Sequence, residues 1–247
     1  MDNVKVSIIT PCYNSEKTIR RTIESVLNQT YQNIEYIIID GKSTDHTVDI
    51  IKEYAGMGNI KYVSEKDKGI YSAMNKGISM TSGKIIGIIN SDDFYEADAV
   101  QKVVAHMSDF PYQVIYGYCN SWRGNRCRKI KVNHKELEER MIPHPTCFVT
   151  RKTYCKYAMF SEWLKIAADY EIMLRFYETR NVRFIQIPDV LANFSEGGIS
   201  MKKGKSSLLK KENLIIQYKY KIISTKELLE NLLEIFLNSK IKMMEID

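Results

Sequence analysis

The chain has 247 residues, enough to bury a full hydrophobic core either as one large domain or as a domain with an appendage. Its contents of 44% hydrophobic and 27% charged residues are ordinary for a soluble globular protein, and no apolar run approaches the roughly 20 residues that span a bilayer. The five cysteines are odd in number and show no Cys-x-x-Cys spacing, so we expect free thiols in a reducing cytoplasm and no zinc site. The seven lysines of residues 201–223 stand against a single acid, Glu212, and account for the whole net charge of +6.

Strand and helix patterns alternate over the first 107 residues. Runs of β-branched residues predict strands at residues 4–10, 34–40 and 60–64 and from Ile85 onward, with Pro11 closing the first of them. Apolar residues at helical spacing predict helices over residues 18–28, through residues 48–54 and 73–78, and from near Ala97. Four such alternations favour a mostly parallel, Rossmann-like α/β sheet with right-handed crossovers and helices on both faces.

The strand from Ile85 has four isoleucines in five positions without alternation, which suits a central strand buried on both faces. It stops at Asn90-Ser91-Asp92-Asp93, and open α/β sheets bind their ligands at such carboxyl ends. Because carboxylate oxygens are preferred by Mg²⁺ and Mn²⁺, the pair predicts a metal site. The alternative is a polar turn in which one aspartate caps the next helix. The first two strands end at the same edge, near Thr10 and Asp40, so the three ends can line one crevice.

Beyond residue 110 the strict alternation of strands and helices ends. Strands are predicted at residues 114–119, 126–132, 147–150 and 182–187, and a helix at residues 167–177. Pro143-His144-Pro145 forms a rigid break, and Gly197-Gly198 marks a flexible loop. The tail from Ser206 is predicted to be helical, with an apolar stripe of Leu228, Leu229, Leu232, Leu233 and Phe236.

Four segments, taken in order, resemble the family 2 glycosyltransferases of the GT-A fold. They are Val-Ser-Ile-Ile-Thr-Pro-Cys-Tyr-Asn-Ser (6–15), Ile-Ile-Ile-Asp-Gly-Lys-Ser-Thr-Asp (37–45), Ser-Glu-Lys-Asp-Lys-Gly-Ile-Tyr-Ser-Ala-Met-Asn-Lys-Gly (64–77) and Asn-Ser-Asp-Asp (90–93). The resemblance covers residues 4 to about 200. It implies an inverting bacterial enzyme that uses Mn²⁺ or Mg²⁺ to transfer a hexosyl or N-acetylhexosaminyl group from a nucleotide diphosphate sugar, most often a UDP-sugar. It also implies that residues 1–110 form the donor-binding half and residues 111–200 the acceptor-binding and catalytic half of one domain, with residues 201–247 as a basic, amphipathic tail.

The resemblance also assigns roles to individual positions. It implies donor binding by Thr10, Pro11, Tyr13, Asp40, Asp67, Asn75, Lys76 and Asp92, with Asp40 at the base, and metal binding by Asp93 together with Asp92. It implies that Asp169 is the catalytic base, and it associates acceptor or pyrophosphate contacts with His144, Gly197, Gly198 and Ser200. Ser72 departs from the pattern, because many relatives of this subgroup have Asp there.

Structural explanations remain open for several of these residues. Asp40 could be a turn former before Gly41, and Asp169 a helix N-cap. His144, between two prolines, could be structural, and Asp67 a solvated loop acid.

Three functional classes are compatible with a sheet of this kind. The first is a cytoplasmic-side glycosyltransferase that adds a sugar to a hydroxyl of a glycan or lipid-linked acceptor during cell-surface polysaccharide synthesis, with no nucleic-acid partner. The second is a sugar nucleotidyltransferase, which needs a Gly-rich, Arg-containing loop where this chain has Pro11-Cys12-Tyr13-Asn14. The third is a catalytically inactive sugar-nucleotide-binding or scaffold protein, which the carboxylates Asp40, Asp92, Asp93 and Asp169 argue against. The tail has two interpretations, peripheral contact with the inner membrane face or packing on the catalytic domain.

Overall fold

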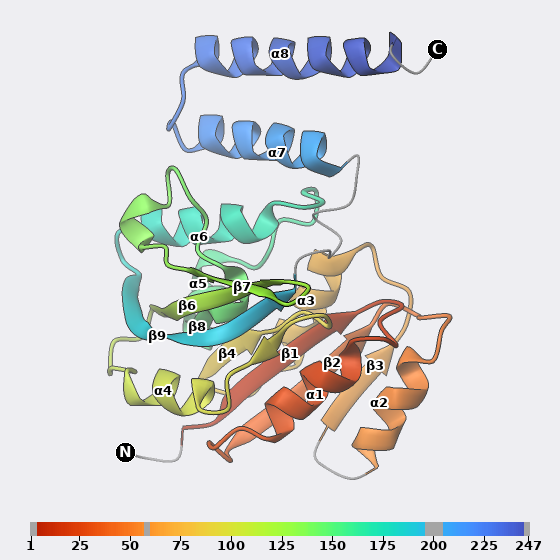
Figure 1. Cartoon of the computed structure of the whole chain (residues 1–247). Helices are drawn as coiled ribbons and strands as arrows, with labels where there is room; N and C mark the ends of the chain where they lie inside the picture. Colours follow the sequence, from red (N-terminus) through yellow and green to blue (C-terminus); the bar gives the residue numbers. More distant parts are fainter. Residues whose placement is uncertain (1–3, 57–59, 196–204, 245–247) are drawn as a thin grey trace.

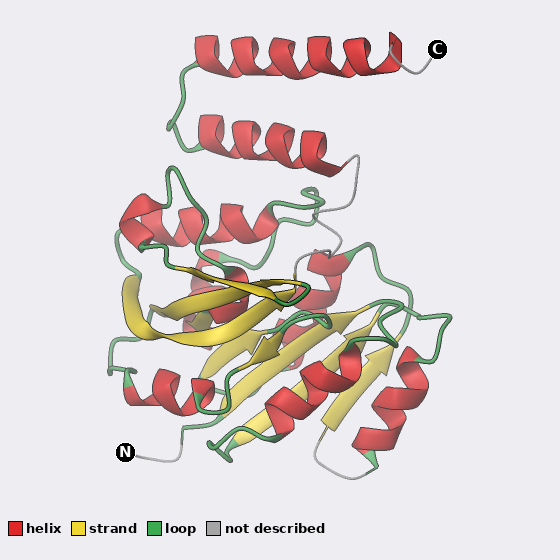
Figure 2. Cartoon of the chain, viewed as in Figure 1, coloured by secondary structure: helices red, strands yellow, loops and turns green. Residues whose placement is uncertain are grey.

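The computed structural model describes residues 4–56, 60–195 and 205–244 (Figure 1). A nine-stranded mixed sheet forms its centre, in the order β3-β2-β1-β4-β8-β6-β9-β5, with β7 paired to β6. Helices cover both faces of the sheet, and two further helices follow at the C-terminal end (Figure 2). The predicted α/β class and the helical tail are confirmed.

The first half of the chain supplies the parallel part of the sheet. Its elements are β1 (Val6–Cys12), α1 (Ile19–Leu27), β2 (Ile34–Asp40), α2 (Thr47–Ala55), β3 (Ile60–Ser64), α3 (Ile70–Met80), β4 (Ile85–Ile88), β5 (Phe94–Tyr95) and α4 (Ala99–Ala105). Strands β1 to β4 pair in parallel, so their carboxyl ends lie along one edge. The register aligns Cys12 with Asp40, and Asp40 with Ser64.

The second half supplies the mixed part of the sheet, in which β6 and β9 pair in parallel and the other new pairs are antiparallel, and it also supplies the outer helices. Its elements are β6 (Gln113–Arg123), β7 (Arg126–Ile130), η1 (His134–Glu136), η2 (His144–Thr146), β8 (Phe148–Thr150), α5 (Arg151–Tyr157), α6 (Ala168–Glu178), β9 (Arg183–Ser195), α7 (Lys205–Lys219) and α8 (Thr225–Met244). Helix α7 lies over α6, and α8 forms the outermost layer (Figure 1). No helix within the described ranges is both long enough and apolar enough to cross a membrane.

Two hydrophobic cores sandwich the sheet. Ile9 and Ile86 belong to the core shared with α3 and α6, whereas Ile8 and Ile85 belong to the core shared with α1 and α4. All four side chains are 0% exposed, as expected for strands that are covered on both faces. The isoleucine-rich sequences of β2 and β4 therefore correspond to this two-sided burial.

Strand β1 continues through Pro11, where the sequence predicts its end. Ile9 faces β4, because its carbonyl accepts a hydrogen bond from the Ile89 backbone. Pro11 lies two residues further on and faces the same side, but the pairing with β4 has already ended at Ile88. The missing N–H of proline therefore leaves no ladder hydrogen bond unmade, which is how proline is accommodated in strands.

Strand β9 runs further than predicted, to Ser195. Its pairing with β6 shifts register between Tyr116 and Tyr118, opposite Gln186 and Val190. Such a bulge accommodates Pro188 and lets the strand resume its pairing. The extension matters because Ser195 reaches the turn after β4.

Candidate active site

The loops after β1, β2 and β4 meet at one edge of the sheet. The Gly41 backbone donates to the carbonyl of Cys12, which joins the ends of β1 and β2. The hydroxyls of Ser15 and Ser91 lie 2.7 Å apart and join the loop after β1 to the turn after β4. The predicted crevice is therefore assembled from three strand ends, as in other open α/β sheets.

Gly41 brings Tyr13 and Asp67 together. A Cβ on Gly41 would lie 2.8 Å from Asp67 Oδ2 and 3.5 Å from Tyr13 Cδ2, so both side chains pack directly over the glycine. Tyr13 is 56% exposed, and the Gly69 backbone holds Asp67 by donating to Oδ1 at 2.8 Å. An accessible aromatic ring beside a carboxylate is a surface on which a nucleobase and its ribose can rest.

Asp40 is completely buried and engaged by neighbouring groups. The backbone and hydroxyl of Ser43 both donate to its carboxylate, and the hydroxyl of Ser64 donates at 2.6 Å. Thr10 is also buried, with its hydroxyl 2.9 Å from that of Tyr36, and Pro11 lies beside it. A direct contact between Asp40 and a base would require exchange of one of these bonds, so its donor role stays a prediction.

Asn75 and Lys76 lie on α3 and bind other parts of the protein. The side chain of Asn75 accepts from the Phe160 backbone at 2.9 Å and donates to the Phe160 carbonyl at 3.0 Å. Lys76 forms an ion pair with Glu65. These contacts fix the loop before α6 and the loop after β3, and the predicted donor contacts remain untested.

The turn after β4 carries Asp92 and the completely buried Asp93. The Ser195 backbone donates to Asp93 Oδ1 at 3.1 Å, and Asn90 Nδ2 donates to Oδ2 at 3.3 Å. The carbonyl of Asp92 accepts from Ser195 Oγ and from Arg21 Nη2, each at 2.8 Å. Burial, together with the adjacent Asp92 charge, raises the pKa of Asp93 well above its ordinary value.

These residues fit a divalent cation. Asn90 Oδ1 is buried beside Asp93 and has no hydrogen-bond partner in the described part of the chain, so an unpaired oxygen lies next to a carboxylate whose raised pKa the charge of Arg21 offsets only in part. The described residues contain no group of three metal-binding His, Cys, Asp or Glu side chains. Mg²⁺, however, commonly binds through one or two carboxylates, substrate phosphates and water, so two aspartates suffice.

Asp169 lies at the start of α6 and is half-buried. Its Oδ1 accepts from the Tyr170 backbone at 3.0 Å and lies 3.2 Å from the hydroxyl of Tyr71 on α3. Burial raises the pKa of Asp169 to about 6, against the bonds from Tyr170 and Tyr71 that lower it. A carboxylate with a pKa near the working pH is suited to accept a proton during a reaction.

His144 is 5% exposed and packs under the same region. Its ring centroid lies 5.5 Å from that of Phe160, which in turn stacks on Tyr71 at 5.7 Å. Burial lowers the pKa of His144 to about 4, so the ring is neutral at physiological pH. A packing role explains these contacts, and an acceptor role for His144 stays a prediction. The predicted acceptor or pyrophosphate residues Gly197, Gly198 and Ser200 lie outside the described residues.

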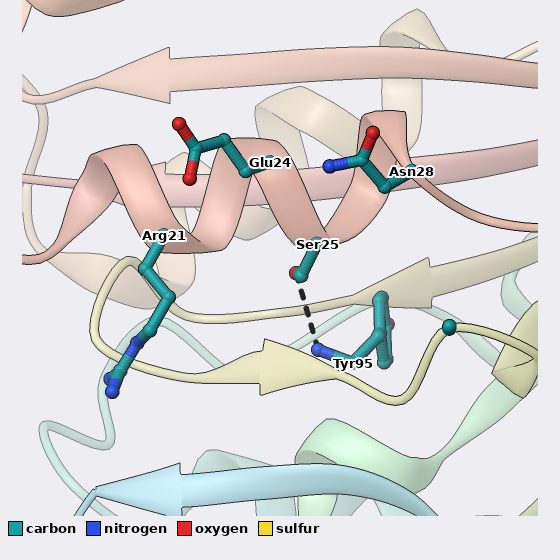
Figure 3. Close-up of a pocket in the computed structure, with 6 residues that line it drawn as sticks. Arg21, Glu24, Ser25, Asn28 and Tyr95 are labelled. Carbon is teal, nitrogen blue, oxygen red and sulfur yellow. Dashed lines mark hydrogen bonds between the residues drawn. The ribbon is translucent and has the colours of Figure 1, made fainter.

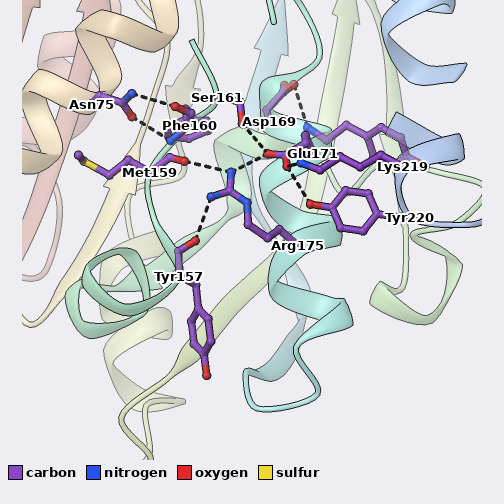
Figure 4. Close-up of polar contacts among 11 residues, drawn as sticks. Asn75, Tyr157, Met159, Phe160, Ser161, Asp169, Glu171, Arg175, Lys219 and Tyr220 are labelled. Atoms are coloured by element: carbon purple, nitrogen blue, oxygen red, sulfur yellow. Dashed lines mark hydrogen bonds and ion pairs between the residues drawn. The ribbon is translucent and has the colours of Figure 1, made fainter. Parts of the chain in front are cut away.

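Helix α6 is fastened to its surroundings through Glu171, whose side chain is 0% exposed (Figure 4). Arg175 Nη2 lies 2.6 Å from its carboxylate, and Lys219 Nζ and the Tyr220 hydroxyl approach to 2.7 and 2.8 Å. Arg175 also donates to the carbonyls of Tyr157 and Met159. The network therefore joins α6 to the loop after α5 and to α7.

A separate hollow lies between α1 and β5 (Figure 3). It has a volume of about 240 Å³ and is lined by Arg21, Glu24, Ser25, Asn28, Tyr95 and Ala97. Ser25 Oγ accepts from the Tyr95 backbone at 3.2 Å and closes one side. The lining contains none of the predicted donor or base residues, although it includes Arg21, which also binds the Asp92 carbonyl.

Comparison with known proteins identifies the family. The family model described as "Glycosyl transferase family 2" matches residues 7–164, more than half of the chain. The chain belongs to this family. The match includes the turn with Asp92 and Asp93 and ends just before α6, so the base candidate Asp169 lies outside it.

Individual relatives agree with the family and extend the likeness to the fold. The chondroitin synthase of Escherichia coli is 33% identical over 184 residues, which cover 70% of this chain and 26% of that protein. This chain thus spans about a quarter of that relative's length. The structure of S. aureus TarS 1-349 in complex with UDP-GlcNAc matches with a TM-score of 0.71 at 20% identity, over 86% of this chain and 66% of that one. A mannosyltransferase from Pyrobaculum calidifontis, in complex with GDP-Man and Mn²⁺, matches with a TM-score of 0.69 at 17% identity over 94% and 70%. The GT-A fold expected from the sequence is confirmed.

Several residues that shape the site were not predicted from the sequence. Tyr71, Arg21 and Ser195 each contact a predicted site residue from an element distant in the chain. Only Tyr71 lay within a motif, the 64–77 segment; Ser195 became relevant because β9 runs past its predicted end. Long-range contacts of this kind leave no periodic signal in a sequence.

Proposed function

We propose that this glycosyltransferase transfers a sugar with inversion from a nucleotide diphosphate sugar to an acceptor hydroxyl, with Asp169 as the base. The observation that carries the proposal is the presence of two different carboxylate centres in one domain. Asp92 and Asp93 form a paired centre after β4, and Asp169 is a single carboxylate held by Tyr71. Two adjacent carboxylates are suited to bind a cation, and a single carboxylate with a raised pKa is suited to accept a proton from the acceptor.

Departure of the nucleoside diphosphate is the first chemical requirement. Charge accumulates on this leaving group as the glycosidic bond breaks, and a divalent cation, when bound, would stabilise that charge as a Lewis acid. Asp93 and Asp92 would hold the cation, while Ser195 and Arg21 keep their turn in place. The family neighbour solved with GDP-Man and Mn²⁺ supports this assignment by analogy.

Activation of the acceptor is the second requirement. Asp169 would take the proton from the attacking hydroxyl, which becomes a better nucleophile as the new bond forms. One base is enough because no second side chain has to protonate the leaving group, in contrast with the two carboxyl groups of glycoside hydrolysis. Attack opposite the leaving group inverts the anomeric centre.

The donor proposed is a UDP-sugar carrying a hexosyl or N-acetylhexosaminyl group. The exposed ring of Tyr13, packed with Asp67 over Gly41, would receive the nucleoside. A solved structural neighbour in complex with UDP-GlcNAc supports this class of donor, as does a chondroitin synthase relative. The second relative in the same line of evidence is the hyaluronan synthase of Pasteurella multocida, 28% identical over 219 residues, which span 85% of this chain and 22% of that protein.

The acceptor proposed is a glycan or a lipid-linked glycan at the cytoplasmic face of a membrane. Helix α8 exposes Leu229, Leu233, Phe236 and Leu237, each at least 50% exposed, and α7 exposes Lys210 and Lys211. An apolar stripe and nearby lysines would allow peripheral contact with an anionic surface.

A panel of nucleotide sugars tests the proposal most directly. The protein is incubated with UDP-GlcNAc, UDP-GalNAc, UDP-glucose, UDP-galactose and GDP-mannose in Mn²⁺, with and without an oligosaccharide acceptor, and nucleoside diphosphate release is measured. We expect release with at least one UDP-sugar and loss of release in EDTA. Binding of a donor without release under any condition would favour the inactive sugar-nucleotide-binding alternative.

A further inference from the structure

Glu212 is a buried carboxylate that the proposed chemistry does not use. It is the single acid among the lysines of residues 201–223, and it lies on α7 with 5% of its surface exposed. Its Oε1 accepts from the Lys165 backbone at 2.7 Å, and its Oε2 accepts from the backbones of Ile166 and Ala167 at 2.9 Å each. Both oxygens of the Glu212 carboxylate are therefore bound by backbone N–H groups inside the protein.

The three backbone groups belong to the segment that leads into α6. Ala167 is the N-cap residue of this helix, and its side chain forms no capping bond. On the other side of the segment, the Tyr71 hydroxyl donates to the Ile166 carbonyl at 2.6 Å. Residues 165–167 are therefore clamped between α7 and α3, and Asp169 follows two residues later.

We propose that Glu212 is a positioning residue for Asp169, fixing the entry of α6 and placing a second carboxylate behind the base. The inference rests on the proposed role of Asp169 in catalysis. Through Glu212, α7 contributes to catalysis by holding the segment that precedes Asp169.

Attachment of α7 alone does not require this carboxylate. Ile216 is 0% exposed in the core shared with α6, and Lys219 and Tyr220 bind Glu171. Burial of a carboxylate is costly unless its charge is compensated, and among the described residues the hydrogen bonds that Glu212 accepts come from the segment before Asp169. The location of the three donors therefore connects Glu212 with the base and not simply with helix docking.

The charges around Asp169 give the inference a measurable sign. The titratable groups that face it are Tyr71 on α3, Glu212 on α7 and the buried thiol of Cys147 before β8. The bond from Tyr71 lowers the pKa of Asp169, whereas the charge of Glu212 raises it. Tyr71 and Glu212 both hold residues 165–167. If the substitutions Tyr71→Phe and Glu212→Gln only loosened this segment, they would shift the pKa of Asp169 in the same direction. If each acts through its electrostatic effect on Asp169, the two substitutions shift this pKa in opposite directions.

The pKa of Asp169 can be measured without any substrate, by a carboxyl-carbon NMR titration in which Asp169→Asn assigns the resonance. We expect Glu212→Gln to lower this pKa and Tyr71→Phe to raise it. Glu212→Asp keeps the charge, so its titration should remain close to that of the parent even though the shorter side chain reaches fewer donors. Shifts of the same sign in Glu212→Gln and Tyr71→Phe, or an unchanged titration in Glu212→Gln, would overturn the inference.

Turnover provides the second measurement, with the donor and acceptor found by the panel. We expect Glu212→Gln to lower kcat about tenfold and to leave the donor KM unchanged, because misplacement of a reacting group acts on the chemical step. Glu35→Gln is the matched control. Glu35 is also a buried glutamate that accepts a hydrogen bond from a backbone N–H, that of Ser82, but it lies at the amino end of β2, away from the strand ends that form the candidate active site. It should lower the Tm while leaving kcat and the titration of Asp169 unaltered. If Asp169→Asn retains full activity, the proposed base is wrong; if it is inactive and Glu212→Gln titrates as the parent does, only the role of Glu212 is wrong.

Discussion

The paired centre at Asp92 and Asp93 and the single centre at Asp169 are both carboxylate sites with raised pKa values, but for different reasons. Burial is the largest cause in each. At Asp93 a like charge on the adjacent residue adds to it, whereas Asp169 is partly relieved by the hydroxyl of Tyr71. The like charges of the pair repel each other unless a cation binds between them. The single carboxylate has a pKa close to neutral pH without any cation. Burial thus leads to different chemistry at the two centres, because the neighbours decide what each centre will bind.

The largest expected effect comes from removing the single carboxylate. Asp169→Asn should lower transfer by roughly 10² to 10⁴-fold, the usual contribution of a general base, while donor binding and the response to Mn²⁺ remain. Because burial raises the pKa of Asp169, the ionised form destabilises the fold at neutral pH, so the Tm of Asp169→Asn should equal or exceed that of the parent. Transfer rates and thermal melting check both points. If the transfer rate fell by less than about threefold, Asp169 would be only a helix cap, and the protein would have no second catalytic carboxylate to compare with Asp92 and Asp93.

Disruption of the paired centre should appear in the metal response. Asp93→Asn should weaken the apparent affinity for Mn²⁺ by at least about 100-fold, because even indirect support of a metal ligand contributes 10 to 100-fold. Titration of activity with Mn²⁺ after EDTA treatment measures it. Asp49→Asn, at an exposed acid on α2, is the control and should behave as the parent. Normal turnover of Asp93→Asn in EDTA would contradict the assignment.

The pH dependence distinguishes the two centres with the parent protein alone. A carboxylate base works only when deprotonated, so kcat/KM should rise with pH and level off above about 6, the pKa of Asp169. Below that value activity should fall about tenfold per pH unit. A single acidic limb centred near 4, the ordinary value for aspartate, would show that another group controls the reaction.

The smallest effect on turnover is expected from α8, which contacts neither centre. Deletion of the chain after residue 224 should change kcat with a water-soluble acceptor by less than about twofold, because the contacts of α6 end at α7. The same deletion should abolish co-sedimentation with anionic liposomes, which the parent should show at low salt and lose largely at high salt as lysine attraction is screened.

Two outcomes would change this view of the tail. Equal partitioning of the parent onto neutral and anionic liposomes, or onto neither, would exclude electrostatic membrane contact. If removal of α8 greatly lowered kcat with a soluble acceptor, α8 as well as α7 would be needed to support the active site, and the tail could not be treated as separate from the two carboxylate centres.

Much of the N-terminal half, residues 1–110, could be predicted from the sequence because its signals are local. The β-branched residues of positions 34–40 and 60–64 predict β2 and β3 with the bounds that the structure gives, and the end of the isoleucine-rich strand before it indicates the turn with Asp93. Other features depend on pairing between distant segments. Pro11 remains within β1 because β4 ends early, and Ser195 reaches Asp93 because a bulge lets β9 pass Pro188. Both facts are invisible until the strands are placed side by side.

The tail shows the same limit from another direction. Composition marks residues 201–223 as basic, and a basic segment favours a solvated or surface-binding helix. In the structure, the acid of this segment, Glu212, is buried and binds the backbone of Ala167, and Lys219 forms an ion pair with the buried Glu171. The helical pattern also continues past Lys221, yet α7 ends at Lys219: two residues later Lys221 has a φ of 59°, and the Ile222 backbone donates to the Gln217 carbonyl. This six-residue closing bond is a Schellman motif, formed here without the usual glycine.

The hydrogen bonds that complete the two centres also set an order of biosynthesis. Ser195 closes the turn of Asp93 from 102 residues downstream, and Glu212 reaches Ala167 across 45 residues. A ribosome therefore releases the whole parallel sheet before either carboxylate can take its final place. The N-terminal half can begin to fold as it emerges, since domains fold from the N-terminus during synthesis. Until β9 and α7 have been synthesised, however, the nascent chain lacks the Ser195 backbone group that binds Asp93 and the Glu212 carboxylate that binds Ala167, so neither carboxylate centre is held as it is in the finished protein.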